Sequence, residues 1–206
     1  MKTLFGKKVG MTRIFDATGN MIPVTVVKAD PHSVIQVKTA DKDGYVAIRV
    51  AFGDIRDKLV NKPLAGQFKK AGLSSHRHIR ELKLGVGDEY NVGDTIKVDI
   101  FAAGEKIKVS GISKGLGFQG AVRRHNFGGG PKTHGQSDRL RAPGSVGASS
   151  YPSRTYPGQR MAGHMGNVKV TVKNLRVVGV EPEHNLLLIR GAVPGKPGGL
   201  LKIEKA

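Results

Sequence analysis

Residues 45–52, Tyr-Val-Ala-Ile-Arg-Val-Ala-Phe, place an apolar side chain at every second position. This period is typical of a half-buried β-strand. Short β-branched runs precede it at 22–27 and 33–38, and residues 16–20 and 41–44 supply the turns between the runs. Short strands with frequent turns predict an antiparallel sandwich or barrel.

The rest of the chain extends this mainly β pattern with one mixed insertion. The insertion covers about 54–85, and within it Pro63 and Gly72 can open and end a short helix. A further short helix is possible at 119–125. More strands are expected at 94–101, 106–110, 168–172, 175–180, 185–190 and 200–203.

Residues 111–165 differ in kind from the rest. They hold 12 of the 29 glycines and no apolar run long enough for a core strand. A structureless loop of this length is unusual inside a compact domain. We therefore expect a β body formed by 1–110 and 166–206, and an extended loop at 111–165 that is either disordered or ordered by a partner.

Composition narrows the function classes. The chain has no cysteine, which excludes a disulfide scaffold, a zinc–thiolate site and a thiol enzyme. No membrane span and no targeting segment are expected. The net charge is +18, and residues 106–180 carry thirteen lysines and arginines against one acid, Asp138. A solvated surface normally mixes signs, so this imbalance indicates a nucleic-acid partner.

Two motifs suggest other chemistry but lack its context. Residues 115–120 match the G-x-G-x-x-G nucleotide fingerprint, yet no βαβ unit surrounds them. Gly144-Ser145-Val146-Gly147 lacks the strand–turn–helix of a nucleophile elbow. The seven histidines form no spaced metal constellation. We therefore expect no enzyme activity, cofactor, metal or small-molecule substrate.

The loop also contains four aromatic residues. Phe118 and Phe127 are expected to pack locally, in a segment with little core of its own. For Tyr151 and Tyr156, local packing and stacking on RNA bases are equally expected.

Several blocks together carry a family resemblance. The sequence resembles the family of bacterial ribosomal large-subunit protein three at Leu4–Thr12, Ser110–Gly115 with Gly117–Gly120, Asn126–Gly135, Pro143–Gly147, Met161–Gly166 and Asn185–Gly195. It departs from the family at Leu116, at His125 and at Leu140-Arg141-Ala142. Some members carry a methylated glutamine where this chain has Ser150, so that modification is not expected here.

The resemblance implies a translation-factor-like antiparallel β-barrel body with a long Gly-rich extension. It also implies a structural, cytoplasmic protein of the large ribosomal subunit that binds large-subunit ribosomal RNA early in assembly, beside neighbouring ribosomal proteins. The extension would reach toward the peptidyl-transferase centre. A basic nucleic-acid-binding protein outside the ribosome and a nucleotide-dependent enzyme using 115–120 remain alternatives.

The candidate RNA-binding residues are mostly cations, with histidines and a polar tip. In the body they are Lys2, Lys7, Lys8 and Arg13. In the extension they are Lys114, Arg123, Arg124, His125, Lys132, His134, Arg139, Arg141, Ser149, Ser150, Tyr151, Arg154, Arg160 and His164.

Overall fold

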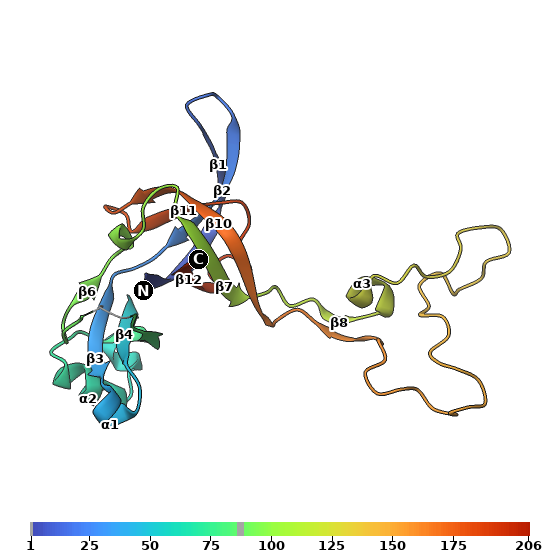
Figure 1. Cartoon of the computed structure of the whole chain (residues 1–206), viewed down its shortest axis with the longest axis horizontal. Coiled ribbons are helices and arrows are strands. Elements are labelled where there is room, and N and C mark those ends of the chain that lie inside the picture. Colours follow the sequence, from blue (N-terminus) through green and yellow to red (C-terminus); the bar gives the residue numbers. More distant parts are fainter. Residues whose placement is uncertain (1, 86–88) are drawn as a thin grey trace. The chain divides into compact units, whose positions relative to one another are not determined.

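Six strands close an antiparallel β-barrel in a computed structural model that describes residues 2–85 and 89–206 (Figure 1). Around the barrel their order is β1-β12-β7-β10-β11-β2. Their bounds are β1 Thr3–Phe15, β2 Met21–Lys28, β7 Lys106–Ile112, β10 Lys169–Glu181, β11 Leu186–Arg190 and β12 Leu200–Lys205. The expected mainly β fold with an antiparallel barrel is confirmed.

The two longest strands depart from the expected pattern. β1 was not expected from alternation, because glycine and lysine interrupt its apolar residues. A side chain at Gly6 would approach Val27 to 2.6 Å, so glycine allows β1 to pass close to β2. β10 is continuous where two strands were expected, because Asn174 adopts a left-handed conformation at a bulge in the β7 pairing.

A second sheet packs beside the barrel, with strand order β5-β4-β3-β6. Its strands are β3 His32–Lys38, β4 Ala47–Asp54, β5 His76–Lys83 and β6 Thr95–Ile96. Strand β5 was not expected, and the strand expected at 94–101 is reduced to β6 and a 3-10 turn at Val98–Ile100. Short helices α1 (Ala40–Asp43) and α2 (Lys62–Lys70) and a 3-10 turn at Asp57–Leu59 complete this part.

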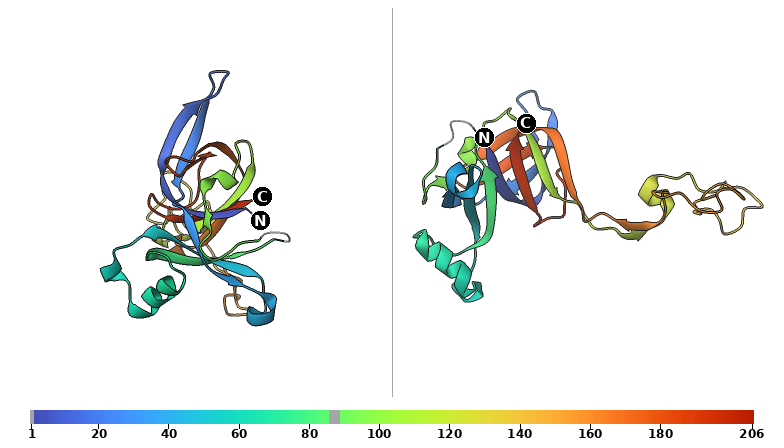
Figure 2. Two further views of the ribbon diagram at one scale, coloured as in Figure 1. Left: turned by 90° about the vertical axis from the view of Figure 1, so that its left-hand side faces the viewer. Right: turned by 60° about the horizontal axis from the view of Figure 1, so that its bottom comes forward.

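The core explains why β4 is buried on both faces rather than on one. Val50 and Phe52 join the main apolar cluster, which also contains barrel residues such as Leu187 and Ile203. On the opposite face, Ala51 packs with Phe68 of α2 in a second cluster. Figure 2 shows α2 beside the sheet formed by β3 and β4.

Contacts divide the chain into two compact units. Unit 1 comprises residues 1–112 and 169–206, of which residue 1 and residues 86–88 are outside the described part, and unit 2 comprises residues 113–168. Unit 2 contains the strand pair β8 (Gly117–Gln119) and β9 (Gly163–Met165) and helix α3 (Ala121–His125). Among the described residues, no helix is long and apolar enough to cross a membrane.

Candidate nucleic-acid interface

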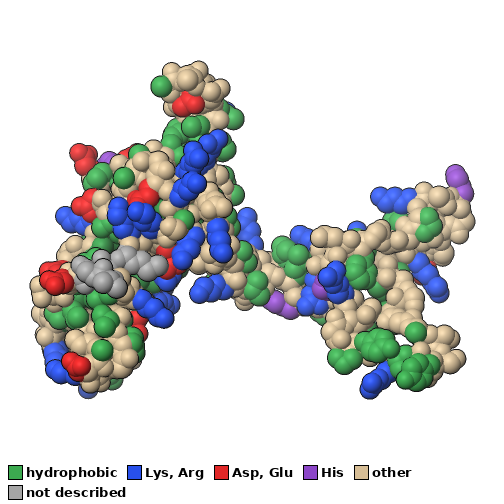
Figure 3. Space-filling model, in the orientation of Figure 1, with side chains coloured by type: hydrophobic (Ala, Val, Ile, Leu, Met, Phe, Trp, Pro, Cys, Tyr) green, Lys and Arg blue, Asp and Glu red, His purple; other side chains and the backbone are tan. Residues whose placement is uncertain are grey.

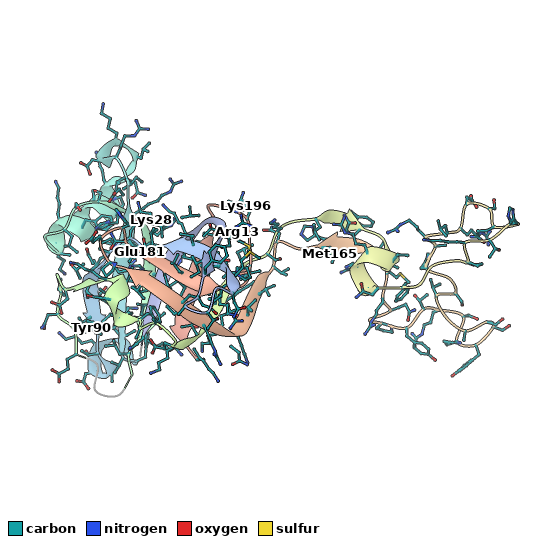
Figure 4. The ribbon with its side chains drawn as sticks, turned by 90° about the horizontal axis from the view of Figure 1, so that it is seen from above. Arg13, Lys28, Tyr90, Met165, Glu181 and Lys196 are labelled. Carbon is teal, nitrogen blue, oxygen red and sulfur yellow. The ribbon has the colours of Figure 1, made fainter. Side chains whose placement is uncertain are left out.

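A narrow antiparallel ladder opens unit 2. The Ser113 amide donates to the Val168 carbonyl at 2.9 Å, and the Leu116 amide donates to the Met165 carbonyl at 3.0 Å. Figure 4 labels Met165, the last residue of β9. Gly166 has a φ of 76°, and a Cβ there would lie 2.1 Å from the Lys114 carbonyl oxygen. Only glycine therefore allows the two chains to run this close.

Helix α3 is fastened to the returning chain through one carbonyl group. A guanidinium nitrogen of Arg124 donates to the Met161 oxygen at 2.7 Å, and Nε2 of His125 lies 3.0 Å from the same oxygen. The His125 ring also lies 6.0 Å from the Phe127 ring. Two of the expected RNA-binding residues therefore position the chain within unit 2.

Beyond α3 the chain forms two irregular lobes. The Gly130 amide donates to the Leu140 carbonyl at 3.0 Å and closes the first lobe, residues 131–139. At Gly129, whose φ is 75°, a Cβ would lie 2.3 Å from the same carbonyl oxygen. The second lobe, residues 143–160, carries the expected tip. Some glycines of this segment are thus required by the chain's own close contacts.

Most cations of unit 2 have no partner within it. Six are exposed and make no ion pair or side-chain hydrogen bond with any described residue; these six free cations are Lys114, Lys132, Arg139, Arg141, Arg154 and Arg160. Arg123 is also exposed and reaches only Gln119, at 3.5 Å. In the view of Figure 3, unit 2 shows Lys and Arg side chains but no Asp or Glu.

The remaining expected residues of unit 2 are exposed as well. His134, His164, Ser149, Ser150 and Tyr151 are all exposed, and the Tyr151 side chain is 87% accessible. The Ser150 carbonyl accepts a hydrogen bond from the Ser153 hydroxyl.

The aromatic residues differ in their surroundings. Phe127 is partly buried beside His125, as expected for local packing. For Phe118 this expectation is wrong, because its side chain is 77% exposed. Unit 2 forms almost no core around it, since Ala121 is the only buried apolar residue among the described residues 113–168. Tyr156 is 58% exposed.

The four expected residues of unit 1 lie in different environments. Lys2 forms an ion pair with Glu105 at 3.5 Å, and Arg13 is exposed on the β1–β2 hairpin (Figure 4). Lys7 is partly buried. Lys8 is buried, and its ammonium donates to the carbonyls of Val193 and Gly195 at 3.0 and 3.3 Å. These bonds join Lys8 of β1 to the loop between β11 and β12, so its role is within unit 1 rather than in the interface with RNA.

One further cationic cluster in unit 1 was not expected from the sequence. Arg77 and Arg80 are exposed on β5, beside the partly buried His78. Burial is the main cause that lowers the pKa of His78, and the charges of Lys7, Arg77 and Arg80 lower that pKa further. The signal is the run of histidine and arginine at 76–80, in which Ile79 is the only apolar residue, too few to reveal a strand by alternation.

The alternative sites lack the structural context they require. The 115–120 fingerprint includes β8, which pairs antiparallel with β9, and is followed by a five-residue helix rather than a βαβ unit. Among the described residues, no group of three or more His, Asp or Glu side chains could hold a metal ion.

A comparison with known families identifies the chain. The family model described as ribosomal protein L3 matches residues 83–185, which is half of the chain. The matched region includes all of unit 2 and the two barrel strands, β7 and β10, that lead into it and out of it. The chain therefore belongs to the ribosomal protein L3 family.

Proposed function

We propose that this chain binds large-subunit ribosomal RNA directly through unit 2, early in assembly, with its second lobe toward the peptidyl-transferase centre. Family membership already makes it a structural, non-enzymatic component of the large ribosomal subunit. The proposal adds which residues contact RNA and when they do so.

The six free cations are the observation that carries the proposal. Asp138 is the only acid in unit 2 and makes no ion pair with a described residue, so nothing inside the unit neutralises these side chains. Ribosomal RNA offers a phosphate for each of them, and lysine and arginine contacts to phosphate are the main source of RNA affinity.

Exposed aromatic rings support the choice of RNA over a simple polyanion. Phe118, Tyr151 and Tyr156 are each more than half exposed. Unstacked RNA bases commonly stack on such rings, and each stacked base adds about 1–3 kcal/mol.

The absence of a core supports early binding. A segment with one buried apolar residue gains little stability from its own contacts and depends on its surroundings for order. If RNA surrounds unit 2, the unit must be present before the RNA closes around it.

Neighbouring ribosomal proteins have a candidate contact in the exposed apolar residues Met11, Phe15 and Met21 of the β1–β2 hairpin.

The experiment compares two variants that lose the same charge from different units. In the first, the six free cations become glutamine. In the matched control, six exposed lysines of unit 1 without ion pairs to described residues become glutamine: Lys42, Lys58, Lys62, Lys69, Lys83 and Lys97. Affinity for large-subunit ribosomal RNA is measured by filter binding across a salt series.

The first variant should reduce the slope of log K against log salt by roughly 4–5, because each lost phosphate contact on RNA removes about 0.7–0.9. The control should retain most of the wild-type slope. Equal losses in both variants would overturn the assignment to unit 2 and indicate nonspecific attraction by net charge.

A further inference from the structure

A groove in unit 1 lies between the C-terminal end of α2 and strands β3 and β4. Its volume is about 380 Å³, within the range of sites that hold small molecules. Its apolar surface comes from Ile35, Ala71 and Val92. Val92 is 52% exposed, so the groove has an apolar rim that water reaches.

Polar side chains converge on the groove from both sides. Gln36 on β3 pairs directly with Arg49 on β4, so the two side chains are neighbours on one face of the sheet. Gln67 and Lys70 are three residues apart on α2 and share one face of that helix. None of the four forms a side-chain hydrogen bond or an ion pair with a described residue, and all four line the groove.

The charge of Arg49 acts on one carboxylate, that of Glu81, whose hydrogen-bonded partners lie elsewhere. Glu81 pairs with Arg49 across the β4–β5 register. Its carboxylate instead binds the Lys38 ammonium at 2.8 Å and accepts a hydrogen bond from the Tyr45 hydroxyl at 2.9 Å. Among the described lining residues, the groove therefore retains two cations and no acid.

We propose that this groove binds one nucleotide of single-stranded RNA. Arg49 and Lys70 would hold the phosphate. The Gln36 and Gln67 amides, which both donate and accept hydrogen bonds, fit the edge of a base. The apolar surface fits the base plane. Every residue of the groove belongs to unit 1, whereas the proposed function concerns unit 2. The groove proposal therefore rests on the proposed function only in its choice of RNA as the ligand.

The charge and the amides together favour a nucleotide over an acidic peptide. An acidic peptide would use the two cations through its carboxylates, but its backbone donors and acceptors lie on a flexible chain that must be ordered on binding. A base offers donors and acceptors on one rigid edge, which two amides can match.

The experiment follows the glutamine side-chain amides of the full-length chain by ¹H–¹⁵N NMR. The probes are AMP, GMP, CMP and UMP, with inorganic phosphate and a tetraglutamate peptide as parallel titrations. We expect the Gln36 and Gln67 amides to shift with at least one nucleotide at lower concentration than with phosphate or the peptide.

Variants identify the groove residues. Lys70→Gln and Gln67→Ala should each weaken nucleotide binding about tenfold, as expected for a lost hydrogen bond to a charged or buried group. Arg49→Gln should do the same, and its NMR spectrum reports whether the sheet remains folded. Lys69→Gln is the matched control, because Lys69 is exposed on the same helix and does not line the groove.

Three results would overturn the proposal: no amide shift with any nucleotide, a stronger response to phosphate alone, or tighter binding of tetraglutamate. The glutamine variant of the six free cations tests the two proposals separately, because it alters unit 2 and leaves the groove in unit 1 unchanged. It should bind mononucleotides like the wild type while losing affinity for ribosomal RNA.

Discussion

Units 1 and 2 differ in how their cations are paired and in how far their apolar side chains are buried. In the described part of unit 1, six lysines form ion pairs with acids, and the apolar residues bury one another in two clusters. In unit 2, no cation forms an ion pair with a described residue, and Ala121 is the only buried apolar residue. Unit 1 thus carries its own folding energy, whereas unit 2 presents groups that an external polyanion can satisfy.

The largest expected difference between the units is in their response to a lost leucine. Leu187 is fully buried in the main cluster, and Leu187→Ala should lower the free energy of unfolding by about 2–5 kcal/mol. Leu140 in unit 2 is 39% exposed, and Leu140→Ala should change the free energy of unfolding by less than about 0.5 kcal/mol. Urea unfolding followed by circular dichroism measures both. Similar losses would show that unit 2 shares the cooperative core of unit 1.

The second expected effect concerns acid and again belongs to unit 1 alone. His32 is buried, accepts the Phe5 amide at 3.0 Å through Nε2, and has Nδ1 2.7 Å from the Asp30 carbonyl. Burial lowers its pKa from 6.5 to about 4. Between these values the unfolded chain binds a proton that the folded chain does not, so stability should fall as pH decreases from 6.5 and level off below about 4.

The size of this loss should be about 3 kcal/mol, from about 1.4 kcal/mol per unit of pKa. It is measured as unfolding free energy against pH for the wild type and for His32→Gln, which lacks the titrating ring. His134→Gln in unit 2 is the control and should follow the wild type, because its exposed ring makes no hydrogen bond with a described residue. A His32→Gln variant with unchanged pH dependence would contradict the assignment to His32.

The sequence predicted the barrel where apolar alternation is strong and failed where other forces shape the strand. β5 has one buried residue, Leu82, so its polar pattern resembles a loop although it pairs along most of β4. Alternation at 94–101 does bury Ile96 and Val98, but only two residues there pair with β3. Burial of an alternating run therefore does not require a strand.

The candidate interface was predictable in composition but not in detail. Acid depletion and glycine content located the cationic segment, and exposure of its cations follows from the lack of a core. The internal roles of Lys8 and Arg124 could not be foreseen, because each depends on a carbonyl group far away in sequence. Likewise, the cationic cluster on β5 and the groove beside α2 depend on strand register, which periodicity alone does not fix.

Two short deletions, one in each lobe of unit 2, should have the smallest effect on RNA affinity. They test which lobe lies near the catalytic RNA. Deleting residues 149–152 removes Tyr151 and the exposed serines of the second lobe but no lysine or arginine. Deleting residues 134–137 removes an equal length from the first lobe, also without lysine or arginine. Because phosphate contacts supply most of the affinity, the 134–137 deletion should change ribosomal RNA binding less than about twofold, and the 149–152 deletion should lose at most the stacking of Tyr151 on one base.

The two deletions should nevertheless differ in function if the second lobe lies near the peptidyl-transferase centre. The 149–152 deletion shortens the lobe by up to about 3.3–3.6 Å per residue if it is extended, and should slow peptidyl transfer per purified subunit while subunit yield remains normal. The 134–137 deletion should leave the transfer rate unchanged. Gradient sedimentation measures yield and a single-turnover assay measures transfer. Loss of subunits with the first deletion, or equal transfer rates for both, would place the catalytic RNA away from Tyr151 and leave the phosphate contacts of unit 2 as its main role.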